Sequence, residues 1–235
     1  MNTLFTIVRN DIKLIFRDKS MFIIFLVPAV MLLIFRIGVP LLTNWVSGLK
    51  EYYWLIIAVF TSVSAATPAY LISFLILDER DENVHLLQQI LPLSKQFILK
   101  SRVGLMVLLA FIFTFILISF NSLIYFSVFE IFFISILFSL IPPILTSCIV
   151  AFSKNKIEAV TFYKGLSMVL VIPFVAFFIS PEWKSIFGII PFYWTYNAFH
   201  IKELGLNFFL NFAIGILVHL VYIWFLFKIH LNRIN

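Results

Sequence analysis

Long apolar segments are the feature that most limits what this 235-residue chain can fold into. A helix needs about 20 predominantly apolar residues to cross a bilayer. Stretches of that kind run over residues 21–42, 52–77, 103–120, 131–152, 157–179 and 208–227. Because the chain is 63% hydrophobic and only 12% charged, its surface is predicted to face lipid. The predicted fold class is therefore an all-α integral membrane protein with six transmembrane helices in one domain, residues 1–235.

Residues 2–19 precede the first apolar stretch and predict an amphipathic helix that lies on the membrane surface. Arg9, Lys13 and Arg17 recur every four residues and form one polar stripe. The apolar residues fall largely on the other side, and they are Leu4, Phe5, Val8, Ile12, Ile15 and Phe16. A frayed, soluble N-terminus is the alternative, and the apolar face argues against it.

The distribution of Lys and Arg predicts the orientation. With the N-terminus inside, twelve of the 17 basic residues flank the spans on the inner side and four lie on the outer side. Positive residues accumulate in cytoplasmic loops, so both termini are predicted to be cytoplasmic in a multi-pass plasma-membrane protein. The remaining basic residue, Lys164, lies inside a span, and we expect its side chain to snorkel back toward the cytosol.

Several polar residues inside the spans are candidate pathway residues. Arg36 lies in the outer half of the first span, where we expect it to snorkel outward, with contact to cargo as the alternative. The middle of the second span is small and polar and includes Ser62, Ser64 and Thr67. Small residues let helices approach closely, so a packing surface is the first interpretation and a pore-facing surface the second.

The remaining local signals concern breaks and ends of helices. Pro28 is expected to kink the first span, and Pro142 with Pro143 to kink or break the fourth. Glu130 follows a tight outer turn and is expected to cap the fourth span, with a proton-relay role as the alternative. Residues 180–207 contain Trp and Tyr, which suit the headgroup level, and predict an outer hairpin of short helices that dip into or lie on the outer leaflet.

The longest polar island is residues 78–102, between the second and third spans. It opens with four acids and one base, Asp78, Glu79, Arg80, Asp81 and Glu82, and then becomes amphipathic until Pro92 interrupts it. We interpret it as a cytosolic coupling segment in which the charges of Glu79, Arg80, Asp81 and Glu82 complement a partner. Leu87 and Leu91 would then seat in a groove of that partner. A solvated connector with ordinary helix caps is the alternative.

The sequence lacks the motifs of several other function classes. No G-x-x-x-x-G-K-[ST] motif is present, so the chain is not expected to bind ATP in that way. The four histidines are scattered and Cys148 is the single cysteine, so no metal site and no internal disulfide are expected. The basic residues lie between apolar spans rather than in an arginine-rich patch, which excludes a nucleic-acid partner. A Ser153–Lys156 pair lacks its companion motifs, so we expect no catalytic residues and no enzyme.

These features together resemble the permease subunit of ABC-2 type exporters, the type V exporter fold, over essentially the whole chain. The family's loop motif is matched at Glu79-Arg80-Asp81-Glu82 and again at Leu91-Pro92-Leu93-Ser94, and Lys100 occupies the basic entry to the next span. Asn83-Val84 replaces the family's Gly-Thr, and an apolar residue near Leu86 replaces an acid. The segment from Pro191-Phe192 to Asn197-Ala198-Phe199 resembles the proline segment before the last span.

The resemblance implies a half-transporter. Two permeases, a second copy or a paralogue, would pair in the lipid and sit on two ABC ATPase subunits that bind ATP and Mg, while this chain would hold no cofactor. The implied function is export of an amphiphilic or hydrophobic cargo, such as a peptide, drug or lipid-like molecule. Two other classes stay open: a stand-alone channel or ion-coupled carrier using Arg36, Glu130 and Lys164, and a non-transporting membrane immunity protein.

Overall fold

The computed structural model describes residues 3–46, 48–82, 95–201 and 204–234, and within these ranges the chain forms helices and no strand. Six helical segments are long and apolar enough to cross a membrane. They are Lys19–Thr43, Leu49–Asp81, Gln96–Ser119, Val128–Phe152, Lys156–Phe177 and Leu206–Lys228. The predicted fold class, six spans after an amphipathic N-terminal helix, is confirmed.

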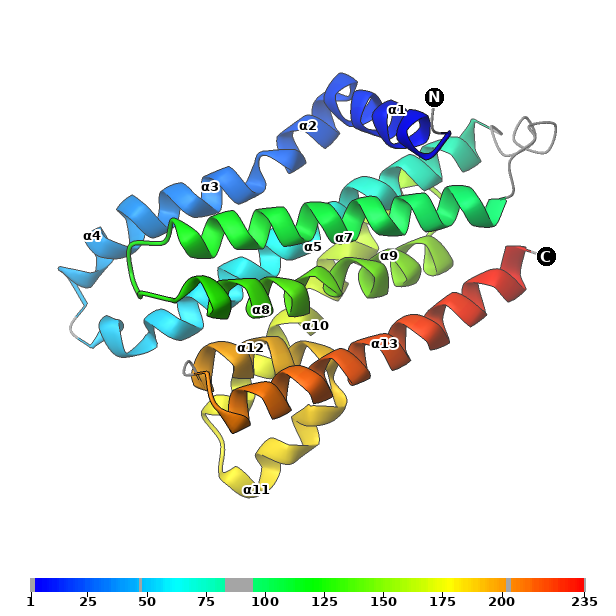
Figure 1. Cartoon of the computed structure of the whole chain (residues 1–235). Coiled ribbons are helices and arrows are strands. Elements are labelled where there is room, and N and C mark those ends of the chain that lie inside the picture. The colour runs from blue at the N-terminus through cyan, green and yellow to red at the C-terminus, as the bar shows by residue number, and fades with distance from the viewer. Residues whose placement is uncertain (1–2, 47, 83–94, 202–203, 235) are drawn as a thin grey trace.

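The first helix, α1 (Thr3–Arg17), lies on the side of the bundle near the end where both chain termini are found, and the chain changes direction before α2 (Figure 1). Asp18 makes that turn, because its side chain accepts hydrogen bonds from the backbone N–H groups of Ser20 (2.7 Å) and Met21 (3.1 Å). This is an ordinary helix N-cap. The Asp18 cap fixes the angle between α1 and the first span.

The first span consists of four helical pieces: α2 (Lys19–Phe25), α3 (Val27–Leu33), a π-helical turn (Ile34–Gly38) and α4 (Val39–Thr43). The break at Leu26 comes just before Pro28, so the predicted kink is confirmed. Most of the exposed side chains of the first span are apolar, as a lipid-facing helix requires.

Two long helices form the centre of the molecule. A 3-10 turn (Leu49–Tyr52) leads into α5 (Tyr53–Asp81), and the span that contains α5 is the most buried of the six. Helix α7 (Lys95–Ser119) packs against α5 (Figure 1). Helix α5 continues four residues beyond the predicted limit of its span, and α7 begins eight residues before residue 103. The two ends of the polar island, residues 78–81 and 95–102, are therefore helical.

The fourth span is split as predicted, into α8 (Val128–Ser139) and α9 (Ile141–Phe152), because prolines occupy the first turn of α9. Glu130 forms a capping box with Ser127: the Ser127 hydroxyl accepts the Glu130 N–H, and the Glu130 carboxylate accepts the Ser127 N–H. The predicted capping role of Glu130 is confirmed.

The last third of the chain packs against this centre. Helix α10 (Lys156–Val171) continues as a 3-10 turn (Ile172–Phe177), and the hairpin contains α11 (Pro181–Lys184), a 3-10 turn (Ser185–Ile189) and α12 (Pro191–Ile201). The final helix, α13 (Leu206–Ile234), packs on α12 and α9 (Figure 1).

Helix α12 belongs to the predicted outer hairpin, and short helices are found there as predicted. Its side chains Phe192, Tyr196 and Phe199 are almost fully buried in the bundle core. Their three- and four-residue spacing places the aromatic rings on one face of α12. That face packs inward, and the place of the hairpin in or on the outer leaflet stays a prediction.

Gly215 permits the close approach of α13 to its neighbours. A Cβ atom at this position would lie 2.9 Å from Leu137 Cδ1 on α8 and 2.9 Å from Trp194 Cβ on α12. Any larger residue must therefore separate these helices. Small residues serve this purpose in membrane bundles, where packing rather than hydrophobic burial holds helices together.

Candidate functional site: an ion-pair cluster around the N-terminal helix

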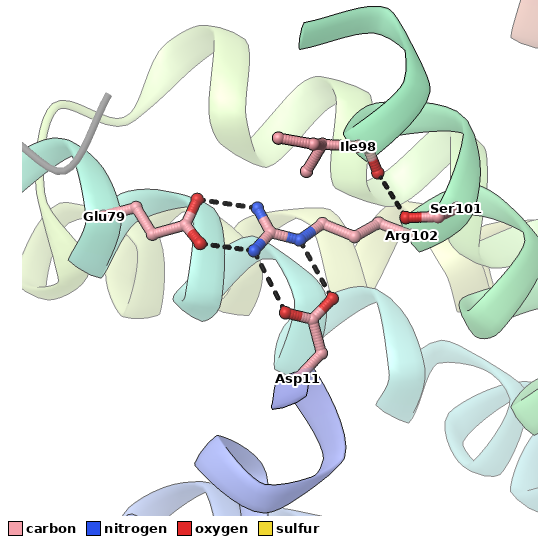
Figure 2. Close-up of polar contacts among 5 residues, drawn as sticks. All are labelled: Asp11, Glu79, Ile98, Ser101 and Arg102. Atoms are coloured by element: carbon pink, nitrogen blue, oxygen red, sulfur yellow. Dashed lines mark hydrogen bonds and ion pairs between the residues drawn. The ribbon is translucent and has the colours of Figure 1, made fainter. Parts of the chain in front are cut away.

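Arg102 on α7 is the centre of the most strongly linked group of charges in the described residues. Its Nε and Nη2 atoms donate to the two carboxylate oxygens of Asp11 on α1, each at 3.1 Å (Figure 2). Its Nη1 atom donates to Glu79 of α5 at 2.8 Å, and Nη2 also donates to Glu79. The planar guanidinium thus binds two carboxylates at once, which a lysine ammonium does not reproduce.

The Arg102 group is buried as well as paired. The side chains of Arg102 and Asp11 are only 5% and 3% exposed, whereas that of Glu79 is 23% exposed. Buried charges are tolerated when their hydrogen-bonding capacity is filled, and here the fork of Arg102 is shared between the two acids. Three helices that are far apart in the sequence therefore meet at one guanidinium.

Lys156 at the start of α10 repeats this pattern closer to solvent. Its Nζ atom donates to Asp18 at 3.0 Å and to Asp78 at 2.9 Å, and it also lies 5.0 Å from the centre of the Phe74 ring. Each of the three charged side chains is about one third exposed. Burial raises the pKa of Asp18, but the hydrogen bonds from Lys156, Met21 and Ser20 hold it below its ordinary value of 3.8.

Arg80 connects the end of α5 to the end of α9. Its Nη1 atom donates to the backbone carbonyl of Ser153 at 3.1 Å, and its Nη2 atom donates to that of Val150 at 3.4 Å. These carbonyls belong to the last turn and the C-cap residue of α9, where no intrahelical donor is available and the helix dipole is negative. Arg80 therefore acts as a C-terminal cap from a neighbouring helix.

We call these seven residues the ion-pair cluster: Asp11, Asp18, Asp78, Glu79, Arg80, Arg102 and Lys156. It joins α1 and the turn before α2 to α5, α7, α9 and α10. Helix α5 ends at Asp81, two residues beyond Glu79, and α7 begins at Lys95, seven residues before Arg102. In the part of the chain that the structure describes, no three His, Cys, Asp or Glu residues are placed to hold a metal ion. The arrangement holds the ends of these helices together.

Comparison with known proteins identifies the family. Residues 11–227 match the family described as "Rv2686c-like: Fluoroquinolones export permease protein Rv2686c-like". The chain belongs to this family. Two relatives from Mycobacterium tuberculosis are each 24% identical over 228 residues, covering 94% of this chain and 90% of theirs. They are the fluoroquinolones export permease proteins MT2760 of strain CDC 1551 / Oshkosh and Rv2686c of strain ATCC 25618 / H37Rv.

The predicted coupling residues of this Rv2686c-like chain fall into three groups. Glu79 and Arg80 bind groups of their own chain, as described above. Asp81 and Glu82 are exposed at the end of α5. Leu87, Leu91 and Pro92 lie outside the described residues. Contact with a partner therefore stays a prediction, and the structure adds an internal role for the first two residues.

The predicted interfacial residues Arg9, Lys13 and Arg17 are all exposed on α1. The apolar residues do not form the single face that the sequence suggests. Ile15 is 1% exposed and packs into the bundle beside Asp11, whereas Phe5 and Phe16 are at least half exposed next to the basic stripe. Helix α1 thus presents one face to the protein and a second, basic and aromatic face outward, which fits a position at the headgroups.

The predicted pathway residues are mostly enclosed. Ser62, Ser64 and Thr67 are buried on α5, and the hydroxyls of Ser62 and Thr67 donate to backbone carbonyls one turn earlier. The hydroxyl of Ser64 has no hydrogen-bond partner among the described residues. Arg36 is exposed in the π-helical turn, and its Nε atom donates to the Phe120 carbonyl at 3.1 Å, which fastens the first span to the end of α7.

Sequence reasoning did not single out Asp11 or Arg102. The sequence does contain one indication, because Asp11 lies four residues before Ile15 and therefore on the same side of α1. An acid on a buried face requires a buried cation. Arg102 was counted only as a positive charge flanking the third span. The pairing of two residues 91 positions apart is tertiary information.

Proposed function

We propose that this chain is the membrane permease subunit of an ATP-driven ABC exporter of the ABC-2 type. It would move an amphiphilic or hydrophobic cargo out of the cytoplasm, and a separate ATPase subunit would bind ATP and Mg and hydrolyse ATP. The chain would lie in the plasma membrane with both termini cytoplasmic, paired with a second permease. Fluoroquinolones, the cargo in the names of its relatives, are small aromatic amphiphiles and belong to the proposed class.

The observation that carries this proposal is the double attachment of Arg102. A subunit that binds the chain between Glu82 and Lys95 would push on the ends of α5 and α7. Glu79 on α5 and Arg102 on α7 are bonded to each other, and Arg102 is also bonded to Asp11 on α1. A displacement at this point would therefore move three helices together rather than bend one loop.

Charge and topology support the same orientation. Figure 1 shows both termini at the end of the bundle where α5 ends and α7 begins, and the ion-pair cluster is built from residues near these helix ends. Most basic residues flank the spans on the side that is predicted to be cytoplasmic. The amphipathic α1 with its exposed basic stripe is at this end too. Anionic lipid headgroups of an inner leaflet would complement that stripe.

The experiment that tests the proposal is affinity purification of the tagged chain from its own membrane in mild detergent, followed by identification of the proteins that accompany it. We expect an ABC ATPase subunit. The variant Asp81→Lys/Glu82→Lys changes two exposed charges that bind no other described element, so it should retain the fold. It should lower the recovered ATPase by about tenfold, equivalent to about 1.4 kcal/mol of binding free energy.

Glu51→Lys is the matched control, because Glu51 is an exposed acid at the opposite end of the α5 span. Recovery of the ATPase should be unchanged in this variant. If the chain is recovered without an ATPase, or if the Asp81/Glu82 and Glu51 variants lose it equally, the proposed coupling is wrong.

A further inference from the structure

His200, near the end of α12, packs within a group of aromatic rings from three elements. Its ring centre lies 4.8 Å from that of Trp54 on α5 and 5.1 Å from that of Phe177, where the 3-10 turn after α10 ends. Trp54 and Phe177 also contact each other edge to face at 5.0 Å. Tyr193 of α12 stacks on Phe177, with ring centres 5.8 Å apart and ring planes at 13°. One exposed imidazole therefore lies where α12, α5 and the fifth span meet.

This group of rings lies at the opposite membrane surface from the ion-pair cluster. Trp54 and Glu79 are both on α5, and Glu79 follows Trp54 by 25 residues. That length of helix is about 38 Å, which exceeds the hydrocarbon layer of about 30 Å. In the orientation proposed above, the ion-pair cluster faces the cytoplasm, and His200 therefore faces the outer solution.

The surroundings of His200 favour its charged form. Histidine is the side chain that ordinarily changes its charge between pH 5 and pH 8. His200 lies in the last turn of α12, where the negative end of the helix dipole attracts a cation. The rings of Trp54 and Phe177 lie within the distance of about 6 Å over which an aromatic ring attracts a cation, and Trp attracts it most strongly. Protonation should thus strengthen contacts that the neutral ring already makes.

Lys184 on α11 opposes the charged form of His200. Its Nζ atom lies 4.7 Å from the centre of the Phe177 ring, and burial lowers the pKa of its ammonium group below the ordinary value of 10.5. Lys184 and His200 both lie about 5 Å from the centre of one ring, so they are at most about 10 Å apart. Repulsion over that distance is weak near solvent and is screened by salt, whereas the contact with Trp54 is direct. The other titratable groups of the neighbouring elements include Tyr193, Tyr53, Lys50 and Glu51, and Glu182, Lys202 and Glu203 are close in the sequence.

We propose that His200 senses the pH of the outer solution, and that its protonation tightens the contact with Trp54 and Phe177 and so holds α12 to the outer ends of α5 and the fifth span. The side that His200 senses rests on the orientation in the proposed function, whereas the contact does not. Because the folded state favours the charged ring, the stabilisation is complete below about pH 6.5, the ordinary value for histidine, and is lost as the pH rises above it. An acidic exterior would restrain the relative movement of these helix ends and would slow export.

The fluorescence of the purified full-length chain in detergent reports the contact, because a charged imidazole quenches an adjacent indole more strongly than a neutral one does. The difference in emission between the chain and its Trp54→Phe variant isolates Trp54. We expect this emission to fall as the pH is lowered from about 8 to about 5, and to be independent of pH in a His200→Gln background. Trp45→Phe is the matched control, because Trp45 is exposed at the same end of the bundle, and this variant should keep the response.

Two further measurements separate the charge of His200 from its packing. The melting temperature of the chain should exceed that of His200→Gln by about 2–4 °C more at pH 5 than at pH 8. At low ionic strength, Lys184→Met should raise the midpoint of the Trp54 response by at least about 0.3 pH unit, because a repelling cation is removed. The response should persist in Glu182→Gln/Glu203→Gln, which removes the acids close to His200 and Lys184 in the sequence.

The inference is overturned if the emission of Trp54 ignores pH in this range, if the response survives His200→Gln, or if Lys184→Met fails to raise its midpoint. In proteoliposomes, the fraction of the emission that responds to external pH should match the fraction of chains whose N-terminal tag is protected from external protease. A match to the unprotected fraction would place His200 on the side of the N-terminus and would also overturn the inference. None of these results depends on recovery of an ATPase, so this inference and the proposed function fail separately.

Discussion

Replacing Arg102 with Leu tests the ion-pair cluster most directly. The change removes the four hydrogen bonds that join α7 to Asp11 and Glu79. Glu79 retains some contact with solvent, but Asp11 is only 2% exposed and would be left as a buried charge without its cation. Breaking a buried pair by removing one partner costs about 3–5 kcal/mol. We therefore expect the melting temperature in detergent to fall on the order of 10 °C.

The assay follows thermal unfolding through the single cysteine, Cys148, with a dye that fluoresces on reaction with a thiol. Lys100→Leu is the matched control, because Lys100 is an exposed base half a turn away on α7 and its loss should cost under about 1 kcal/mol. Asp11→Leu/Arg102→Met should recover most of the loss, since it removes the buried charge together with its partner. If Arg102→Leu is no less stable than Lys100→Leu, or if the double variant is no better than the single one, the assigned role of Arg102 is wrong.

Two further predictions concern packing and pH. Gly215→Ala should destabilise the protein by about 1–3 kcal/mol, because the added methyl group overlaps atoms of α8 and α12. Gly104→Ala is the control, because its methyl group lies in open space and the change should be close to neutral. The melting temperatures of the two variants are compared by thermal unfolding. Because the pKa of Asp18 is lowered in the folded state, its bond to Lys156 contributes fully to stability above pH 3.8 and is lost as the pH falls through the folded-state pKa. Lys156→Met should therefore flatten the dependence of the melting temperature on pH below about pH 4.

Much of the fold follows from the sequence because the bilayer restricts it. Lipid offers no hydrogen bonds to the backbone, so each apolar stretch of sufficient length has to be a helix. The six spans, the breaks near Pro28 and Pro142, and the cap at Glu130 are all set by local residues, and the structure confirms each of them. The proposed docking of α1 on the headgroups follows from its residue types and stays a prediction.

The ion-pair cluster is harder to predict from the sequence, because it depends on how the helices pack together. The sequence marks Glu79 and Arg80 as charged and places them in a polar loop, where contact with another protein is a reasonable interpretation. Helix α5 instead continues through both residues, and its last turn packs against the ends of α7 and α9. Whether a charge points outward or into a neighbour is decided by that extra turn of helix.

Helix α1 and the turn that follows it are attached to the rest of the bundle at Asp11 and at Asp18. These two attachments differ in strength, and the difference determines which contact a movement would break first. The Arg102 group is buried and has a fully charged cation bonded to two acids, whereas the side chains around Lys156 are each about one third exposed. Exposed pairs contribute about 0–1 kcal/mol, well below the cost of breaking a buried one. A rotation of α1 would therefore keep its contact at Asp11 and release first at Asp18, where the chain enters the first span. The ends of α5 and α7 would stay fixed to α1, and α10 would keep only the bond of Lys156 to Asp78 on α5 within the ion-pair cluster.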